Sequence, residues 1–453
     1  MGKLFGTDGI RGVVGQTLTA PLAYRIGQAA AIAFGETGED KPLFVMGQDT
    51  RISSDLLAGA LTAGLCSCGA NVMDLGVIPT PAVAYLTVAN RASAGVVISA
   101  SHNPFEHNGI KLFSGAGFKL SDELEARMEE LILSEGDLPV KTHGAVGRRL
   151  SGEGQKVRYL DHLAGTVPEG LRGLRVLFDC ANGAASVTAR ELFTRFDLGC
   201  GFIHDTPNGV NINDGCGSTH LESLAGAVVD GGYDLGLAFD GDADRCLAVD
   251  ERGQEVDGDR IMAICAAAMH EAGDLAGGGF VATVMSNLGL HKFAAAHGMK
   301  VLCAQVGDRN VLEMMQREGM RLGGEQSGHI IFLDHMTTGD GQLAALQLLR
   351  ILCWRGKPLS ALAGEVERFP QELVNVVWTG SPEGKKTATA IPSVAATIEK
   401  AEAELGETGR VLVRPSGTEA LIRVMVESSD AALAGKLAQE IAKAIENAQK
   451  SGA

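Results

Sequence analysis

Long apolar runs are missing from this sequence of 453 residues. None reaches the roughly 18 residues that a membrane-spanning helix requires, and residues 1–12 lack the basic-then-apolar pattern of a secretion signal. Basic residues are in the minority, because 39 Lys and Arg stand against 55 Asp and Glu, a net charge of −16. A nucleic acid or an anionic membrane would call for the opposite sign. We therefore expect a cytoplasmic protein with no nucleic acid and no membrane among its partners.

Cysteine motifs are lacking as well. The nine cysteines are odd in number, no pair is spaced Cys-x-x-Cys, and Cys66 and Cys68 are too close together to begin a zinc ribbon. We expect buried thiols in a reducing compartment, and no zinc. The phosphate-binding pattern of ATPases is absent, as is a G-x-G-x-x-G turn before a helix, so binding of ATP or a dinucleotide has no support.

Glycine is in excess, with 60 residues against 13 prolines, which implies many tight turns and close backbone approaches. Short β-branched runs alternate with helical patterns along most of the chain, and this rhythm favours α/β layers with parallel sheets covered on both faces. The strands expected in this region are 43–47, 72–76, 95–99, 174–179, 235–240, 280–285 and 301–304. The helices expected between them include 54–70, 81–90 and 184–196.

The pattern changes near residue 369, after which two helices and three strands predict a small antiparallel sheet covered by helices. Weak periodicity at 138–154 and a turn at 250–257 mark two earlier boundaries. The predicted fold class is α/β, with three related domains of mixed or parallel sheet and a smaller C-terminal α+β domain. The predicted domain limits are 1–153, 154–253, 254–368 and 369–453.

Three carboxylates follow the strand expected at 235–240. Asp240, Asp242 and Asp244 are spaced i, i+2 and i+4 with a glycine among them. Such a loop can wrap one small hard cation, which prefers oxygen ligands, but no Glu stands where an EF-hand needs it. An acidic surface turn is the plain alternative, although three Asp seldom follow an apolar strand in a solvated turn.

A second polar loop follows the strand expected at 95–99 and contains Ser101-His102-Asn103-Pro104. Ser101 is a candidate nucleophile or phosphate carrier. His102 is poorly placed to activate it, because neighbouring residues on an extended chain point apart. An ordinary turn has about equal weight as an interpretation.

The glycine-rich segment 323–329 offers Glu325, Ser327 and His329 to a polyol. A connecting loop is the more frequent interpretation of a single segment of this kind. It therefore indicates a sugar-binding loop only in company with other motifs.

A turn at 414–419 is flanked by Arg414 and by Arg423 on the following strand. Hydroxyls, backbone N–H groups and guanidinium forks in such a turn can cradle an anion. The alternative is a hairpin turn with surface Arg. The residues of the candidate cradle are Arg414, Ser416, Gly417, Thr418 and Arg423.

Taken in this order, the Ser-His-Asn-Pro loop, the Asp-Gly-Asp-x-Asp-Arg loop, the Gly-Glu-Gln-Ser-Gly-His loop and the Arg-x-Ser-Gly-Thr-Glu turn resemble the α-D-phosphohexomutase superfamily over essentially the whole chain. The segments 5–12 and 323–329 are similar to those of its bacterial members that act on glucosamine phosphate. Ala420 departs from the superfamily pattern, which usually has Pro there. The resemblance implies that the four domains surround a central cleft.

The resemblance also implies residue roles. Ser101 matches the phosphoserine that passes its phosphoryl group to the sugar, and its phosphate completes a Mg²⁺ site, one per chain, with Asp240, Asp242 and Asp244. Glu325 and Ser327 match the readers of the sugar hydroxyls, and the 414–423 cradle matches the clamp for the non-reacting phosphate. Arg11, Lys111 and His329 match residues proposed to assist proton transfer and charge stabilisation. His102, the neighbour of Ser101 in the sequence, is a further candidate for these roles.

The implied activity interconverts glucosamine 6-phosphate and glucosamine 1-phosphate through a sugar 1,6-bisphosphate, feeding the synthesis of UDP-N-acetylglucosamine and the cell wall. The same chemistry on mannose or glucose phosphates is the first alternative. A phosphosugar-binding protein without catalysis and a metal-dependent phosphatase are two others. The expected partner is a small phosphosugar, and a homodimer is left open.

Overall fold

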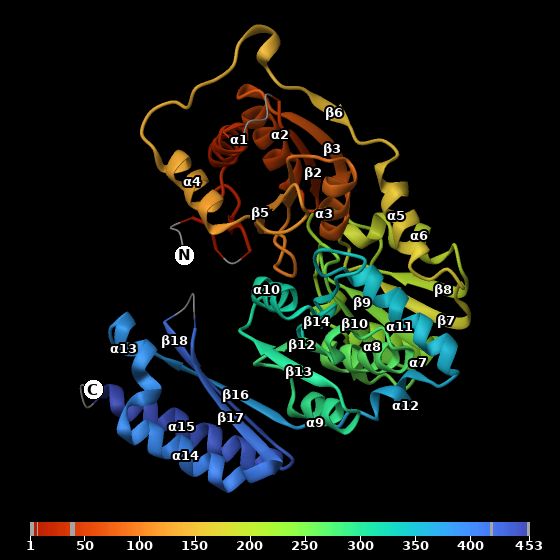
Figure 1. The fold of residues 1–453 in the computed structure, drawn as a ribbon, viewed down its shortest axis with the longest axis vertical. Helices are drawn as coiled ribbons and strands as arrows, with labels where there is room; N and C mark the ends of the chain where they lie inside the picture. Colours follow the sequence, from red (N-terminus) through yellow and green to blue (C-terminus); the bar gives the residue numbers. More distant parts are fainter. Residues whose placement is uncertain (1–3, 7, 37–40, 417–419, 451–453) are drawn as a thin grey trace. The chain divides into compact units, whose positions relative to one another are not determined.

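The computed structural model describes residues 4–6, 8–36, 41–416 and 420–450. The chain divides into two units, of which unit 1 comprises Met1–Thr283 and Lys300–Gly364. Unit 2 comprises Val284–Met299 and Glu365–Ala453. Among the described residues, three sheets lie in unit 1 and one in unit 2 (Figure 1). The domain limits expected within these units remain predictions.

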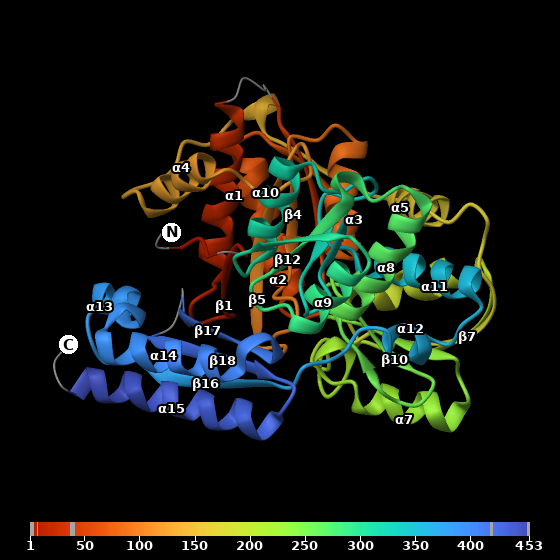
Figure 2. The ribbon, with the colours of Figure 1, turned by 60° about the horizontal axis from the view of Figure 1, so that its bottom comes forward.

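The first sheet has the order β1-β5-β4-β2-β3-β6 and is mixed. Strand β2 runs parallel to β3 and β4, whereas β5 is antiparallel to β4 and β1. Helices α1 and α3 lie on opposite sides of it (Figure 2). The strands are β1 (Ile10–Val13), β2 (Leu43–Gln48), β3 (Asn71–Val77), β4 (Ala94–Ile98), β5 (His107–Ser114) and β6 (Arg149–Ser151). The helices are α1 (Ala20–Gly35), α2 (Ser54–Ser67), α3 (Thr80–Ala89) and α4 (Asp122–Leu133).

The second sheet has the order β11-β10-β9-β7-β8, with parallel strands β8, β7 and β9 followed by antiparallel β10 and β11. Its polar loops at the ends of β7, β8 and β9 gather at one edge, since parallel strands end on the same side. The strands are β7 (Arg172–Asp179), β8 (Asp197–Ile203), β9 (Leu235–Phe239), β10 (Cys246–Asp250) and β11 (Glu255–Val256). The accompanying helices are α5 (Gln155–Gly165), α6 (Ala189–Phe193) and α7 (Glu222–Gly231).

The continuous helix predicted at 184–196 is wrong. The chain forms a 3-10 turn, η2 (Ala184–Val187), followed by the short helix α6. Thr188 between them has φ −124°, outside the helical region, and its buried hydroxyl accepts a hydrogen bond from Gln342 Nε2 at 2.6 Å. A contact from far along the chain thus accompanies the break.

The third sheet, β13-β12-β14-β15, has parallel β13, β12 and β14 and an antiparallel hairpin of β14 and β15. The strands are β12 (Gly279–Thr283), β13 (Lys300–Ala304), β14 (Leu322–Gly324) and β15 (Ile330–Phe332). The helices of this part of unit 1 are α8 (Gly258–Ala272), α10 (Asp308–Glu318), α11 (Gly341–Arg355) and α12 (Leu359–Ala363).

Unit 2 contains the antiparallel sheet β16-β18-β17, and its core includes apolar residues of α14, α15 and the strands, as expected for the C-terminal segment (Figure 1). Helix α9 belongs to this unit: its cap Asn287 donates a hydrogen bond to Phe369 O at 2.9 Å. The elements are α9 (Leu288–Ala296), β16 (Gln371–Val377), α13 (Pro382–Thr387), α14 (Pro392–Leu405), β17 (Gly409–Pro415), β18 (Leu421–Ser428) and α15 (Ala431–Lys450).

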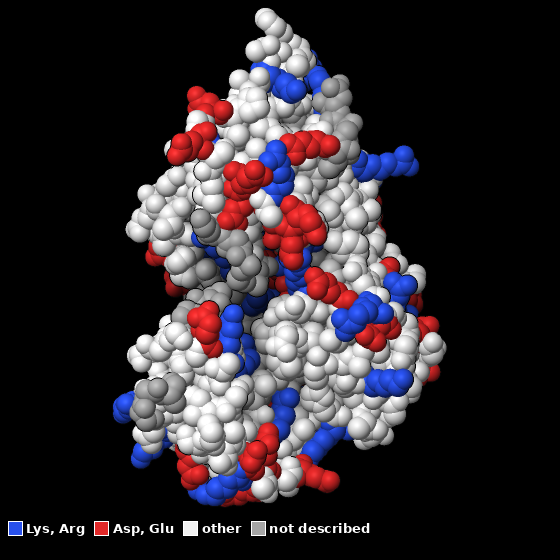
Figure 3. Space-filling view, turned by 60° about the vertical axis from the view of Figure 1, so that its left-hand side comes forward, with Lys and Arg blue, Asp and Glu red and all other residues white. Residues whose placement is uncertain are grey.

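No helix in the described part of the chain combines the length and apolar character that a bilayer crossing requires. On the face shown in Figure 3, basic side chains lie singly or in small groups among acidic and uncharged ones. All nine cysteines are free thiols, five of them buried as expected, whereas Cys303 is exposed.

Helices α1 and α2 cross so closely that their glycines are a packing requirement. A Cβ added at Gly64 would lie 2.0 Å from Tyr24 O, and one at Gly27 would lie 2.4 Å from Leu61 O. By contrast, Gly59, on the same helix as Gly64, has nothing within 4 Å of an added Cβ.

We predict that Gly64→Ala destabilises the protein by about 1–3 kcal/mol, because the methyl group must push the two backbones apart. Its control Gly59→Ala should be neutral or stabilise by up to about 1 kcal/mol, since Ala is the better helix former. Thermal denaturation of both variants beside the parent measures the difference. Equal melting temperatures for Gly64→Ala and the parent would contradict this account of the helix contact.

Candidate functional site

The candidate site in unit 1 lies where polar loops leave three strands. Ser101 stands three residues beyond β4, Asp240 directly follows β9, and Glu325 directly follows β14. The first two loops meet although they belong to different sheets. Ser101 Oγ donates a hydrogen bond of 2.6 Å to Asp240 Oδ2, and both residues are buried.

The backbone around Ser101 is held in an unusual conformation. Ser101 has φ +52°, in the left-handed region that residues with a Cβ rarely adopt. Its N–H donates to Ser99 Oγ at 2.9 Å, and its carbonyl accepts from Arg51 Nη2 at 3.0 Å and from Asn213 Nδ2 at 2.9 Å. Surrounding hydrogen bonds therefore fix the loop that presents the hydroxyl.

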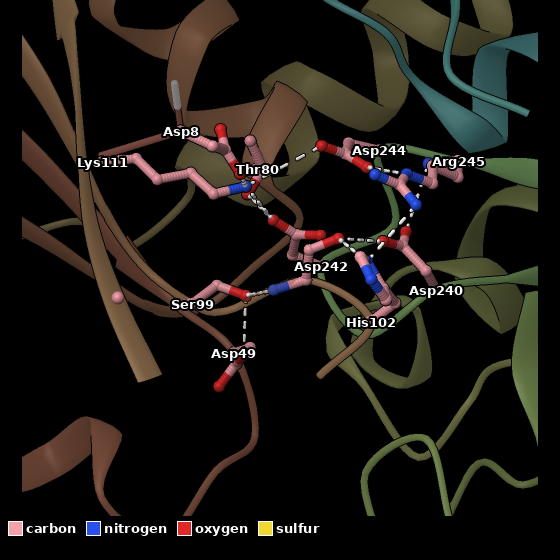
Figure 4. A network of polar contacts seen from close by, with 12 residues as sticks. Asp8, Asp49, Thr80, Ser99, His102, Lys111, Asp240, Asp242, Asp244 and Arg245 are labelled. Atoms are coloured by element: carbon pink, nitrogen blue, oxygen red, sulfur yellow. Dashed lines mark hydrogen bonds and ion pairs between the residues drawn. The ribbon is translucent and has the colours of Figure 1, made fainter. Parts of the chain in front are cut away.

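The acidic loop approaches Ser101 through a glycine. A Cβ added at Gly241 would lie 2.5 Å from Ser101 O, so a larger residue would push the two loops apart. Carboxylate oxygens of Asp240, Asp242 and Asp244 lie within 4.8 Å of one another, and all three residues are buried (Figure 4).

This carboxylate cluster fits a hard divalent cation. Asp242 Oδ1 and Asp244 Oδ1 are buried yet have no hydrogen-bond partner among the residues the structure describes. Burial and the neighbouring Asp244 and Asp242 raise the pKa of Asp240 well above its ordinary value. Oxygen donors that repel one another and lack partners are suited to a cation with oxygen ligands.

Cationic side chains flank the carboxylates. Lys111 Nζ lies 2.9 Å from Asp242 Oδ2 and 3.1 Å from Asp8 Oδ2, and Asp8 also pairs with Arg11. In Figure 4 Lys111 and Arg245 approach from opposite sides. Burial lowers the pKa of Lys111, but Asp242, Asp8 and Asp244 outweigh it and raise that pKa far above the usual value, so this ammonium stays charged.

Of the two candidate histidines, His102 lies beside the Ser101 hydroxyl. Its Nδ1 lies 3.5 Å from Ser101 Oγ and 3.3 Å from Arg245 Nη1. Burial and the charges of Arg245 and Arg11 lower the pKa of His102 to about 4, so the ring is neutral near pH 7. From the sequence we expected the side chains of Ser101 and His102 to point apart. The left-handed turn at Ser101 brings the His102 ring closer to the serine hydroxyl than that argument predicts.

His329 lies on the carboxylate side, with Nδ1 3.6 Å from Asp244 Oδ2. Burial lowers its pKa, but Asp244, Asp308 and Glu325 raise it to about 9. The N–H of Gly339 points at Nε2 at 3.1 Å, which favours the neutral tautomer instead. Both forms carry a proton on Nδ1, so this nitrogen faces Asp244 as a donor in either case.

The loop between β14 and β15 carries the predicted sugar readers. Glu325 Oε1 accepts from Gly307 N at 2.9 Å, and Ser327 Oγ is buried without a hydrogen-bond partner in the described chain. A cavity of about 290 Å³ adjoins this region, with His329, Lys119 and Arg309 in its lining. Glu325 and Ser327 are not part of this lining, so of the three candidates in this loop only His329 borders the cavity.

The predicted phosphate clamp lies in unit 2. Arg414 on β17 and Arg423 on β18 stand directly opposite each other. Burial and the charge of Arg423 lower the pKa of Arg414. Lys385 Nζ donates to Ser416 O at 2.8 Å and adds a third cation. Gly417 and Thr418, which complete the predicted clamp, lie outside the described residues.

Sequence reasoning missed several residues of the site in unit 1. Thr80 Oγ1 donates to Asp242 Oδ2 at 2.7 Å, and Asn213 holds the Ser101 carbonyl. Lys119 Nζ joins Asp308 Oδ1 at 2.8 Å to Asp8 Oδ1 at 3.1 Å. No local pattern marks these residues, because each acts across a long stretch of chain.

Four domain families match the chain in consecutive segments. These are phosphoglucomutase/phosphomannomutase alpha/beta/alpha domain I at residues 2–138, domain II at 157–253, domain III at 257–369 and the C-terminal domain at 373–444. Solved structures share the fold. A phosphoglucomutase/phosphomannomutase family protein from Burkholderia thailandensis has a TM-score of 0.82 at 23% identity, covering 98% of this chain and 97% of the other.

Two structures of N-acetylphosphoglucosamine mutase from Aspergillus fumigatus are also similar. The complex with GlcNAc-6P and magnesium has a TM-score of 0.73 at 19% identity, covering 98% of this chain and 96% of the other. The complex of a serine-to-alanine variant with glucose 1,6-bisphosphate has a TM-score of 0.66 at 20% identity, covering 99% and 96%. At these identities the likeness shows the fold alone.

Sequence relatives are much closer. Phosphoglucosamine mutase of Carboxydothermus hydrogenoformans is 51% identical over 447 residues, which cover 98% of this chain and all of the relative. Phosphoglucosamine mutase of Anoxybacillus flavithermus is 52% identical over 449 residues, covering 98% and 99%. The chain therefore belongs to the phosphoglucosamine mutases, within the phosphoglucomutase/phosphomannomutase family.

Proposed function

We propose that this chain isomerises glucosamine 6-phosphate and glucosamine 1-phosphate, with Ser101 as the phosphoryl carrier. The observation that carries the proposal is the hydrogen bond of 2.6 Å from the Ser101 hydroxyl to Asp240 in the buried carboxylate cluster. An ordinary turn would have no reason to bury a strained serine against three acids. The close relatives named phosphoglucosamine mutase support the same choice of sugar.

A phosphoryl group on Ser101 would add a charge of roughly −1.5 to −2 beside the carboxylates. Asp240, Asp242 and Asp244 would hold Mg²⁺, and the Ser101 phosphate would complete its ligands. A bound Mg²⁺ would neutralise this charge and withdraw electrons from the transferring phosphoryl group. The oxygens Asp242 Oδ1 and Asp244 Oδ1, which have no hydrogen-bond partner among the described residues, support this assignment.

The phosphoryl transfer itself depends on side chains of this protein. The bond from Ser101 Oγ to phosphorus breaks as the O1 hydroxyl of glucosamine 6-phosphate bonds to phosphorus and gives up its proton to a neighbouring base. This step yields the 1,6-bisphosphate. After the bisphosphate reorients, the 6-phosphoryl group returns to Ser101 and the 6-oxygen regains a proton. We assign stabilisation of the loosened phosphoryl oxygens to Lys111 and Arg11, and proton exchange to His329.

The remaining groups position the substrate. Glu325 and Ser327 bind the sugar hydroxyls. The phosphate that does not react is clamped by Arg414, Ser416 and Arg423, together with Gly417 and Thr418 of the same turn. Two guanidiniums on directly opposite positions of neighbouring strands repel, and a phosphate bound by both would relieve this repulsion.

We predict a clear preference for glucosamine 6-phosphate over mannose 6-phosphate and glucose 6-phosphate. Purified protein, with its phosphorylation measured beforehand, should show the highest kcat/KM on the glucosamine compound in a coupled assay that includes catalytic amounts of the 1,6-bisphosphate. A higher kcat/KM on either other sugar would assign the chain to the first alternative. Release of inorganic phosphate in step with sugar consumption would assign it to the phosphatases.

We predict that Ser101→Ala loses nearly all turnover while the fold is retained, because the variant lacks the hydroxyl proposed to carry the phosphoryl group. Intact-mass analysis should find one phosphoryl group on part of the parent protein and none on this variant. The control Ser99→Ala removes a neighbouring hydroxyl, which donates to Asp49 Oδ2 at 2.7 Å, and should still carry the phosphoryl group. Substantial turnover by Ser101→Ala would refute the carrier role.

We predict that Asp242→Asn raises the Mg²⁺ concentration needed for half-maximal activity by at least about tenfold, since one anionic ligand is lost. Its melting temperature should change little by comparison. The exposed Asp230, on α7, provides the matched control, and Asp230→Asn should leave the Mg²⁺ dependence unaltered. An unchanged Mg²⁺ requirement in Asp242→Asn would exclude the carboxylate cluster as the metal site.

A further inference from the structure

A second cluster of metal-ligating side chains lies at the edge of the β7–β11 sheet, outside the carboxylate cluster. Asp179 ends β7, His204 follows β8, and Cys216 precedes the 3-10 turn η3 (Gly217–Thr219). One ligand atom from each of the three lies within 4.8 Å of the other two. The cluster therefore joins a carboxylate, an imidazole and a thiol from three separate loops.

The carboxylate of this cluster is fixed in place. Asp179 is fully buried, and its Oδ1 accepts from Ala181 N at 2.8 Å while its Oδ2 accepts from Gly217 N at 2.9 Å. Carboxylates that ligate metals are typically oriented by such hydrogen bonds. Each oxygen retains a lone pair for another partner.

The imidazole and the thiol lie beside the same carboxylate. His204 Nδ1 lies 3.0 Å from Asp179 Oδ2, and this contact raises the pKa of His204. Cys216 Sγ has a long contact of 3.9 Å with Asn182 Nδ2 and a contact with the backbone N–H of Asn213. A nitrogen, an oxygen and a weakly bonded sulfur therefore converge from three loops, which is a donor set that a soft divalent cation can share.

A nucleophilic or redox-active thiol is the competing interpretation of a Cys-His-Asp cluster. Burial and the carboxylates of Asp179 and Asp214 raise the pKa of Cys216 to about 12, the opposite of what an activated thiolate requires. Cys216 is also fully buried and forms no disulfide. The geometry thus favours a ligand set over a reaction centre.

We propose that Asp179, His204 and Cys216 form a binding site for a divalent transition metal of the Zn²⁺ class. Sulfur and nitrogen donors select such ions over Mg²⁺, and tetrahedral Zn²⁺ places its ligand atoms roughly 3.3–3.8 Å apart. On binding, the Cys216 S–H bond breaks, the sulfur–metal bond forms, and the proton leaves to solvent. His204, whose side chain is 28% exposed, gives the ion its approach from the surface.

This site lies close behind the Ser101 loop. Asn182 N donates to His204 O at 2.6 Å, and Asn213 N donates to Ala181 O at 2.9 Å. The Asn213 side chain in turn binds the Ser101 carbonyl. A metal that holds the three loops together would therefore also fix Asn213, which supports the Ser101 loop. It would do so without using the carboxylates of the first cluster. The sequence expectation of no zinc overlooked this cluster because its members are dispersed.

The test titrates the full-length reduced protein with Co²⁺ and then Zn²⁺ in excess Mg²⁺, which occupies the carboxylate cluster. We expect one equivalent of Co²⁺ to produce a near-ultraviolet thiolate-to-cobalt charge-transfer band, Zn²⁺ to abolish it, and the melting temperature to rise with Zn²⁺. Cys216→Ser should lose the band. His204→Asn, in which Asn tolerates the φ of +47° at this position, should weaken Zn²⁺ binding at least about tenfold.

Cys180→Ser is the matched control, because Cys180 is another buried thiol, next to Asp179 in the sequence, and lies outside the ligand set. It should keep the band and the Zn²⁺ affinity of the parent. Melting curves without added metal establish that each variant is folded. Absence of the band from the parent, its persistence in Cys216→Ser, or unaltered Zn²⁺ affinity in His204→Asn would each overturn the proposal.

Discussion

The organisation of unit 1 depends on the concentration of buried charge around Ser101. Oxygen atoms of three carboxylates converge within 4.8 Å of one another, and Lys111 contacts Asp242 directly while Arg245 approaches from the other side. Burial raises the pKa of Asp244, but His329, Lys111 and Arg245 outweigh burial and hold that pKa well below its usual value. The pKa of Asp240 is raised instead by burial and by its two acidic neighbours. The cluster is therefore only partly compensated by the surrounding cations, and a hard divalent cation would relieve the remaining repulsion.

Holding these charges together needs a scaffold that tolerates strain. The buried pair Asp49 and Arg51 forms the centre of that scaffold, because Arg51 donates to the carbonyls of Ser101 and Asn103. Asn213 binds the same two carbonyls from the second sheet. The left-handed Ser101 thus costs conformational energy that several loop contacts offset, and its hydroxyl is oriented before any ligand arrives.

The sequence predicts the parts of the site that lie within one loop. Asp240, Asp242 and Asp244 are recognisable from spacing alone, and the resemblance adds Ser101 as their partner. The hydrogen bond between the two loops joins residues that are 139 positions apart in the sequence. A pattern within a short stretch of sequence cannot predict a contact over this separation. Thr80 and Asn213 escaped notice for the same reason. The predicted helix at 184–196 failed because Thr188 bonds a residue on α11, a contact that periodicity cannot reveal.

The two kinds of charge in the molecule suit two different tasks. A phosphate that stays bound throughout a reaction is held well by forked, charge-assisted hydrogen bonds, and this is the role proposed for Arg414 and Arg423 on neighbouring strands of unit 2. A phosphoryl group that is transferred needs cations that stabilise its oxygens without holding it permanently. Lys111 suits this second task, because its pairing with Asp242 and Asp8 moderates its pull on a phosphoryl group. With this proposed division, a few local cations would suffice for an anionic ligand in a chain whose net charge is −16.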